Sequence, residues 1–192
     1  MFTAEDIAGW ESHSFEGETR YDLVEVDGRE AVHARCRDAS ASGLFYREEI
    51  DLGKTPILEW TWRVEETFRD IHETRKSGDD YPARVYAVDE HSLAKWRTRA
   101  LNYVWASEMP RGSHWENAYQ SRAIMVAVQS GSAGDSEGNG QWRTQRRDLR
   151  EDFRQYHDKD TDRINGLAIM TDCDDTDAPA EAWYGEIRLK AE

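Results

Sequence analysis

The sequence predicts an all-β protein, a two-sheet antiparallel β-sandwich of jelly-roll type with one or two short helices. About ten short segments have strand character. Few helical segments are long enough to serve as the crossover connections that parallel strands need. Because about ten short strands in 192 residues fit two packed sheets, we expect residues 1–192 to form a single β-sandwich domain.

Composition supports a folded core. A chain of this size buries roughly 70% of the surface that its unfolded form exposes. Hydrophobic residues make up 38% of the chain and include eight Trp, which excludes a disordered protein. No apolar run approaches the length of a membrane span.

The chain has two cysteines, Cys36 and Cys173, which lie 137 positions apart. Their spacing matches neither a zinc motif nor a redox motif. They form either one long-range disulfide or two buried thiols.

The net charge is −14, and the basic residues are 20 Arg and only five Lys. A nucleic acid is excluded as a partner, because phosphate binding needs clustered basic side chains. High acidity with scarce Lys suggests a halophilic protein, since concentrated salt screens repulsion between surface carboxylates. A GC-rich genome, which favours Arg over Lys, is the alternative explanation.

Strand signals follow a short helical turn in the first part of the chain. Thr3 and Asp6 have the spacing of a capping box, so 3–10 is expected to begin with a helical turn. Asp27-Gly28 separates strands expected at 21–26 and 30–36, which predicts a hairpin. A further strand is expected at 43–50.

The clearest strand is 57–65, because apolar and polar residues alternate along it. Leu58, Trp60, Trp62 and Val64 share one face. We expect this face to be buried and the opposite face to contact water. The later expected elements are strands at 83–88, 101–106, 122–130 and 142–149, a short helix or wide turn at 91–99, a flexible loop at 131–140 and a helix at 150–157.

The closing stretch, 163–190, comprises an apolar strand, a loop rich in carboxylates and a second strand. It is expected to form a hairpin-like end piece. The core residues expected from it are Leu167, Ile169, Trp183, Ile187 and Leu189.

The acidic loop is a candidate calcium site. Asp172, Asp174, Asp175 and Asp177 lie within six residues, and Ca²⁺ takes six to eight oxygen ligands in proteins. The loop lacks the glycine and glutamate positions of an EF-hand. The alternative is a solvated turn in a very acidic chain, and no other cofactor is required.

Arginine and aromatic residues supply candidate ligand contacts. Arg84 shares a strand face with Asp80, so it forms either a structural ion pair or an anchor for a ligand. Tyr103 and Trp105 share another strand face, and exposed rings in a sandwich groove suit the apolar faces of sugars.

Signals of catalysis are weak. The six His are dispersed, and neither HExxH nor GxSxG occurs. Glu48 and Glu49 are adjacent on an expected strand and point to opposite faces, unlike a glycosidase pair. An enzyme is therefore unsupported, although carboxylates from different strands could still converge.

Six stretches in their order and spacing resemble the bacterial family known as domain of unknown function 3047. They are 60–64, 76–86, 101–105, 147–153, 164–174 and 182–185. The resemblance covers residues from about 10 to 190. It implies no activity, because the family has no established one. It also implies a domain that usually follows a signal sequence in Gram-negative bacteria.

We therefore expect a periplasmic or secreted protein, although residues 1–6 carry no basic or apolar signal region and a cytoplasmic location stays open. The expected function is a non-catalytic binding module for a glycan or other polyhydroxylated ligand. Arg84 and Arg147 would anchor polar groups, Tyr103 and Trp105 would stack, and Asp152 would accept hydroxyl protons. The alternatives are a polysaccharide hydrolase or lyase and a structural or protein-interaction domain.

Overall fold

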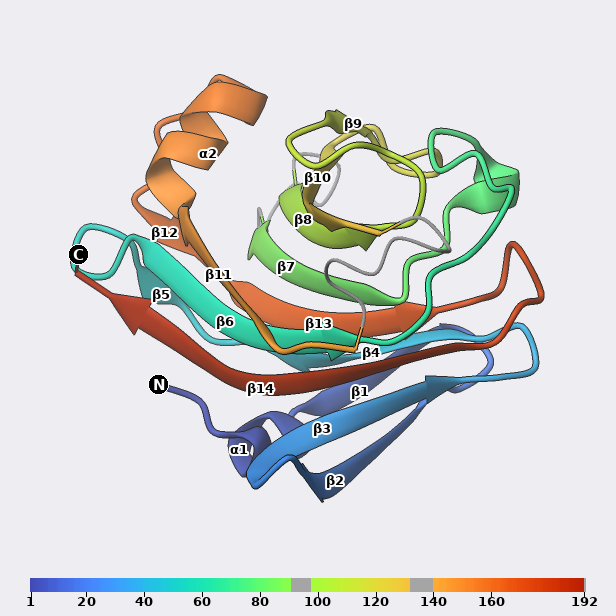
Figure 1. The fold of residues 1–192 in the computed structure, drawn as a ribbon. Helices are drawn as coiled ribbons and strands as arrows, with labels where there is room; N and C mark the ends of the chain where they lie inside the picture. The colour runs from blue at the N-terminus through green and yellow to red at the C-terminus, as the bar shows by residue number, and fades with distance from the viewer. Residues whose placement is uncertain (91–97, 132–139, 192) are drawn as a thin grey trace.

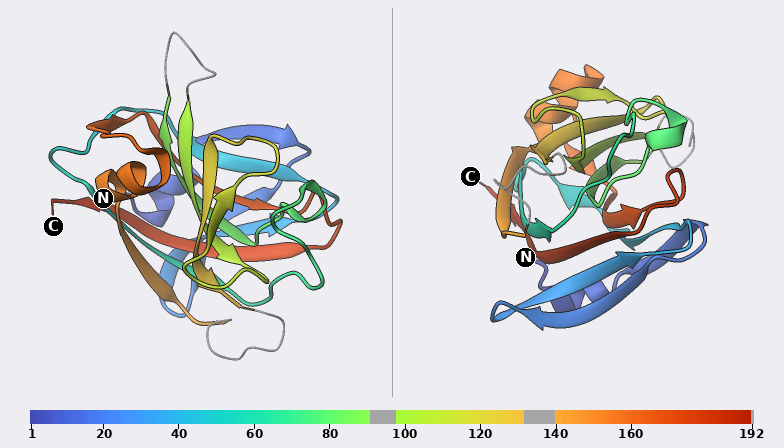
Figure 2. Two further views of the ribbon diagram at one scale, coloured as in Figure 1. Left: turned by 90° about the horizontal axis from the view of Figure 1, so that it is seen from above. Right: turned by 45° about the vertical axis from the view of Figure 1, so that its right-hand side comes forward.

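The computed structural model describes residues 1–90, 98–131 and 140–191. Two main sheets form stacked layers (Figures 1 and 2). One sheet has seven strands, in the spatial order β1 (Glu11–Glu16), β4 (Ala41–Tyr46), β13 (Gly166–Asp172), β7 (Ala83–Asp89), β8 (Arg99–Ala106), β10 (Ala123–Ser130) and β9 (His114–Glu116). The other has five, in the order β11 (Arg143–Asp148), β6 (Ile57–Val64), β14 (Ala180–Lys190), β3 (Arg29–Cys36) and β2 (Arg20–Val26). This architecture confirms the predicted jelly-roll sandwich.

One strand pair departs from the expected antiparallel pattern. β8 and β10 are parallel neighbours. The connection between them contains β9, which pairs antiparallel with β10. Because β9 runs back along the sheet, β10 can begin beside the first residues of β8 without a crossover helix. A short separate pair is formed by β12 (Arg163–Ile164) and β5 (Ile50–Asp51).

The core lies between the two sheets and is rich in large rings. Trp60 and Trp62 of β6 are buried, which confirms the predicted alternation. Trp60 packs against Tyr103 with ring centroids 5.2 Å apart, and Trp62 packs against Trp105 at 5.8 Å. Burial of each such side chain stabilises the fold by about 2–3 kcal/mol. These contacts between β6 and β8 join the two sheets.

Local sequence signals set the N-terminal elements. Thr3 caps α1 (Ala4–Ala8) in the predicted capping box with Asp6. Asp27 and Gly28 both have positive φ, as the predicted tight hairpin between β2 and β3 requires. Strand β1 was not predicted, because every residue in it is exposed and its sequence is polar.

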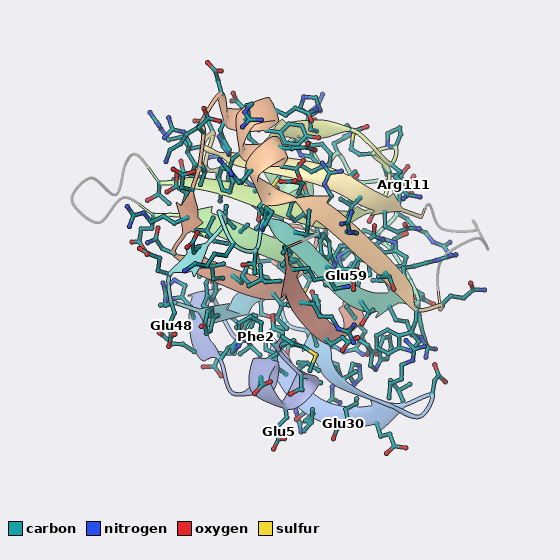
Figure 3. All side chains as sticks on the ribbon, turned by 90° about the vertical axis from the view of Figure 1, so that its left-hand side faces the viewer. Phe2, Glu5, Glu30, Glu48, Glu59 and Arg111 are labelled. Carbon is teal, nitrogen blue, oxygen red and sulfur yellow. A yellow bond between two sulfur atoms is a disulfide. The ribbon has the colours of Figure 1, made fainter. Side chains whose placement is uncertain are left out.

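Helix α2 (Leu149–His157) confirms the predicted later helix and begins at the Asp148 cap. It lies at the opposite end of the molecule from Glu5 of α1 and Glu30 of β3, which are exposed (Figure 3).

The strand expected at 43–50 is divided between β4 and β5. Most of the helix or turn expected at 91–99 and of the loop expected at 131–140 lies outside the described residues, which omit 91–97 and 132–139.

The two closing strands do not form the expected hairpin. β13 belongs to the seven-stranded sheet and β14 to the five-stranded sheet, so they face one another across the core. The Tyr184 hydroxyl bridges the layers by donating to the carbonyl of Met170. Leu167, Ile169 and Ile187 are buried in the core as predicted, and Leu189 packs against it.

Trp183 is largely covered but lies outside the central core, because the neighbouring Tyr184 occupies the inward position. Its ring stacks on His33 of β3 with centroids 4.5 Å apart. Trp183 is therefore buried as predicted, although it packs on His33 and not in the cluster between the sheets.

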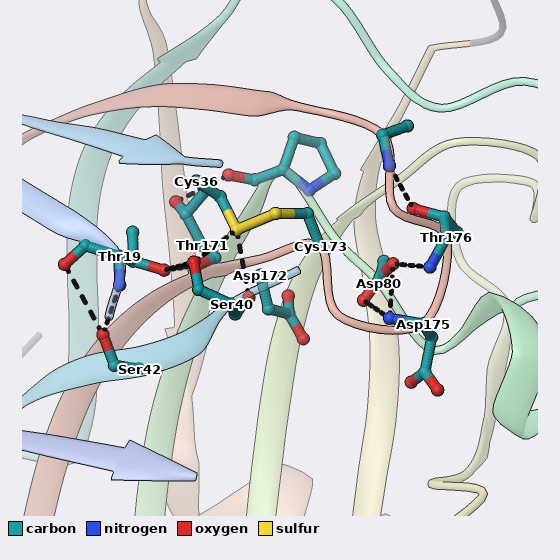
Figure 4. Close-up of a disulfide and its surroundings, with 12 residues drawn as sticks. Thr19, Cys36, Ser40, Ser42, Asp80, Thr171, Asp172, Cys173, Asp175 and Thr176 are labelled. Carbon is teal, nitrogen blue, oxygen red and sulfur yellow. Dashed lines mark hydrogen bonds between the residues drawn. A yellow bond between two sulfur atoms is a disulfide. The ribbon is translucent and has the colours of Figure 1, made fainter. Parts of the chain in front are cut away.

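A disulfide joins Cys36 and Cys173, whose Cα atoms are 6.0 Å apart (Figure 4). Cys36 ends β3 in one sheet, and Cys173 directly follows β13 in the other. The bond therefore links the two layers and decides between the two states left open by the sequence. Among the described residues, no helix has the length and apolar character needed to cross a membrane.

Candidate functional site

A cleft of about 490 Å³ lies over the outer face of the seven-stranded sheet. Side chains that alternate with the core residues form its floor. Phe45, Tyr86 and Asn102 occupy one row across β4, β7 and β8, and the small Ala168 of β13 pairs with both Phe45 and Tyr86. The cleft volume is within the range of small-molecule sites.

One end of the cleft is aromatic. Phe15 of β1 is 60% exposed, and its ring centroid is 6.3 Å from that of Phe45. Phe45 lies at the same distance from Tyr86. A break in the β1–β4 register between Ser14 and Glu16 places Phe15 at this edge. These rings offer flat apolar surfaces to a ligand.

The other end is acidic and combines segments that are far apart in sequence. Asp79 follows η1 (Lys76–Gly78), whereas Asp174 and Asp175 belong to the loop after β13. Figure 1 shows η1 and the β13–β14 loop at the same end of the molecule. The Tyr119 hydroxyl donates to Asp175. This hydrogen bond places Tyr119, a residue that is 57% exposed, beside the acidic wall.

Arg84 lies in the cleft lining but is already paired. Its Nε donates to Asp172 Oδ1 at 2.9 Å, and its Nη2 donates to Asp172 Oδ2 and to the carbonyl of Asp79. Both side chains of the ion pair are buried. Arg84 therefore forms a structural ion pair, with Asp172 in place of the expected Asp80.

Asn102 contributes a buried acceptor at the centre of the floor. It is 1% exposed and lines the cleft. Its side-chain oxygen has no hydrogen-bond partner in the described part of the chain. Since buried polar atoms are normally paired, this oxygen is a candidate ligand contact.

Three carboxylates could hold a metal ion. Asp80, Asp174 and Asp175 each offer an oxygen within 4.8 Å of the others. Asp80 also accepts the backbone N–H groups of Asp175 and Thr176 (Figure 4). Burial, together with the charges of Asp80 and Asp175, raises the pKa of Asp174 to about 6.

This trio differs from the expected ligand set. Asp172 is engaged by Arg84, and Asp177 is exposed outside the trio. Asp80, which was not predicted, takes part because the segment after η1 packs against the acidic loop. The carboxylates thus come from two segments and not from one loop.

The structure brings three of the five predicted ligand contacts together, but away from the cleft. Tyr103 and Trp105 are fully buried between the sheets, where no ring face is open to a ligand. The Tyr103 hydroxyl donates to Asp152 Oδ2 at 2.6 Å, and Arg147 Nε donates to the same oxygen at 2.7 Å. Only Arg84 lines the cleft.

The family model described as "Protein of unknown function (DUF3047)" matches residues 8–188. The chain belongs to this family, as its motifs suggested. No curated protein matches the sequence.

Solved structures share the fold. One is the family 30 carbohydrate-binding module of the cellulosomal cellulase Cel9D-Cel44B from Clostridium thermocellum. It has a TM-score of 0.51 and 13% identity, with 97% of this chain and 92% of that chain covered. The glycoside hydrolase domain structure of Endo-D from Streptococcus pneumoniae R6 has a TM-score of 0.50 and 8% identity, with 95% of this chain and 22% of that chain covered. This chain therefore shares its fold with a carbohydrate-binding module and with part of a glycoside hydrolase domain structure.

Proposed function

We propose that the cleft over the seven-stranded sheet binds a glycan or other polyhydroxylated ligand, and that the chain acts as a non-catalytic binding module. One observation carries the proposal: the same cleft combines exposed rings with hydrogen-bond acceptors. Sugar rings present apolar C–H faces that pack on aromatic side chains, and their hydroxyl groups donate to acceptors. The shared fold is consistent with this role.

The proposed contacts differ from those expected from the sequence. Phe15 and Tyr119 replace Tyr103 and Trp105 as stacking rings, because they are exposed in the cleft. Asn102 takes the acceptor role that had been expected for Asp152, which is engaged by Arg147 and Tyr103.

Alanine substitution of Phe15 or Tyr119 is expected to weaken glycan binding several-fold to about tenfold. A ring contact contributes about 0.5–1.5 kcal/mol, and 1.4 kcal/mol corresponds to a factor of ten. Isothermal calorimetry against a panel of soluble oligosaccharides measures this change. Leu23→Ala is the matched control, because Leu23 is also exposed but lies on β2 of the other sheet. Equal weakening by the control, or no bound glycan in the panel, would contradict the proposal.

A hydrolase is the second candidate, favoured by the pKa of Asp174, which is raised to about 6. Glycosidases use a carboxylic acid of raised pKa with a second carboxylate nearby. Incubating the same oligosaccharides with the protein and measuring chain length distinguishes the two functions. Shortened products that Asp174→Asn abolishes would establish the hydrolase. The cleft itself argues against a structural domain without a small ligand.

A calcium ion at Asp80, Asp174 and Asp175 is also proposed, in place of the loop-only set. Carboxylate oxygens are suitable calcium ligands, and an ion would hold the loop against the segment after η1. Millimolar Ca²⁺ added to chelator-treated protein is expected to raise the melting temperature. Asp174→Asn should remove this increase, whereas Asp177→Asn should keep it. An unchanged melting temperature in the wild type would exclude the ion.

We further propose a periplasmic or secreted location. The disulfide between Cys36 and Cys173 supports it, because such bonds persist mainly in oxidising compartments. Fractionation of cells that produce the protein from its full gene tests this location. Recovery only in the cytoplasmic fraction would contradict it.

A further inference from the structure

The cleft has an excess of negative charge. Its lining contains five acidic residues, Glu16, Asp79, Asp172, Asp174 and Asp175, and among the described residues one basic residue, Arg84. Asp172 neutralises Arg84, and both side chains are buried. Four carboxylates therefore remain without a basic partner in the lining.

The acidic end concentrates this charge on one wall. Asp174 and Asp175 offer oxygens within 4.8 Å of one another and of Asp80. Lys76 lies outside the lining, and its ammonium is 4.8 Å from the Tyr119 ring centroid. Lys76 contacts this ring and is not in the cleft lining, so it does not count among the charges that line the cleft.

An independent feature of the floor also requires a hydrogen-bond donor. The side-chain oxygen of Asn102 is buried in the cleft without a partner among the described residues. A hydroxyl or ammonium group from a ligand would satisfy it, whereas a carboxylate would not. The floor and the acidic wall therefore both favour a ligand with hydrogen-bond donors, and the wall also favours a ligand with positive charge.

We infer that the ligand is a cationic glycan whose amino groups lie against Asp174 and Asp175, where they would take the place of the proposed calcium ion, while its sugar rings pack on the aromatic end. This inference rests on the proposed glycan-binding function and narrows it to amino sugars with free amines. Uronic acids and sulfated sugars are disfavoured, because no unpaired cation in the described lining would offset their charge.

Four tetrasaccharides with the same β-1,4 linkage test the inference: those of glucosamine, N-acetylglucosamine, glucose and glucuronic acid. The first three differ only in the group at C2, which is an amine, an acetamide or a hydroxyl. Calorimetry is performed in chelator at about pH 6.5, so that the free amines retain charge and no divalent cation neutralises the wall.

The glucosamine tetramer is expected to bind at least about tenfold more tightly than the acetylated and glucose tetramers. Half-molar salt should reduce this preference, because salt screens exposed charges. Asp174→Asn/Asp175→Asn should abolish the preference. Glu5→Gln/Glu30→Gln makes the same change in net charge at exposed positions outside the cleft lining (Figure 3) and should retain it.

The outcomes separate the inference from the function on which it rests. Equal binding of the neutral tetramers, or a preference that survives Asp174→Asn/Asp175→Asn, would overturn the cationic ligand and leave glycan binding intact. If none of the four tetrasaccharides binds, both the cationic ligand and glycan binding are overturned for β-1,4-linked glycans. Melting curves establish that each variant is folded, and the single variant Asp175→Asn serves if the double variant is not.

Discussion

Replacing Arg84 by methionine is expected to lower the free energy of unfolding by about 3–5 kcal/mol. The side chains of Arg84 and Asp172 are 6% and 2% exposed. Without the guanidinium, Asp172 is a buried carboxylate whose side chain keeps one hydrogen bond within the described residues, from the backbone N–H of Tyr81 at 3.1 Å. Methionine keeps most of the side-chain volume, so the loss reflects charge more than packing. Urea unfolding at neutral pH measures the change.

A double-mutant cycle with Asp172→Asn provides the control. The amide keeps an acceptor for the Tyr81 N–H but carries no charge. The double variant should therefore be more stable than the sum of the two single losses predicts, with a coupling energy of about 1–3 kcal/mol. A loss below about 1 kcal/mol for Arg84→Met, together with additive effects, would show that the ion pair is energetically unimportant.

Removing the disulfide by Cys36→Ala/Cys173→Ala is expected to destabilise the protein by about 3–5 kcal/mol. The two cysteines are separated by 137 positions, so the bond strongly restricts the unfolded chain. For a chain of this length, the melting temperature should fall by roughly 8–15 °C. Differential scanning calorimetry measures the shift.

Reductant supplies the matched comparison. Wild-type protein melted with a phosphine reductant should approach the melting temperature of the double variant, whereas the variant itself should be insensitive. Thiol titration of the unfolded, unreduced wild type should find no free cysteine. Two titratable thiols, or equal melting temperatures for wild type and variant, would contradict this prediction.

Much of the sandwich was predictable because strands such as β6 bury alternate side chains between the sheets. The alternation at Trp60 and Trp62, the Asp27-Gly28 turn and the Thr3 cap are local signals that the structure retains. Strand β1 could not be found in this way, because all its residues are exposed and only pairing with β4 makes it a strand. The separation of β13 and β14 into different sheets likewise depends on tertiary pairing.

The candidate site was less predictable, since its residues come from the outer faces of several strands. Tyr103 and Trp105 are two positions apart and therefore share one face of their strand. Periodicity does not say which face the second sheet covers, and here it covers theirs. Tyr86 lies in the 76–86 stretch that resembles the family, and its parity with Arg84 places it on the opposite strand face from the core residues Val85 and Ala87. Phe15 and Tyr119 carry no periodic signal, because one lies at a register break and the other in a loop.

The disulfide also affects how a ligand meets the acidic wall. Cys173 directly precedes Asp174 and is covalently attached to β3 of the opposite sheet. The disulfide therefore fixes the first residue of the loop that carries Asp174 and Asp175 before any ligand binds. Ordering a mobile loop opposes binding by about 0.5–1.5 kcal/mol for each immobilised side chain. A wall fixed in advance avoids much of that loss, so the proposed glycan ligand would bind to a preformed surface.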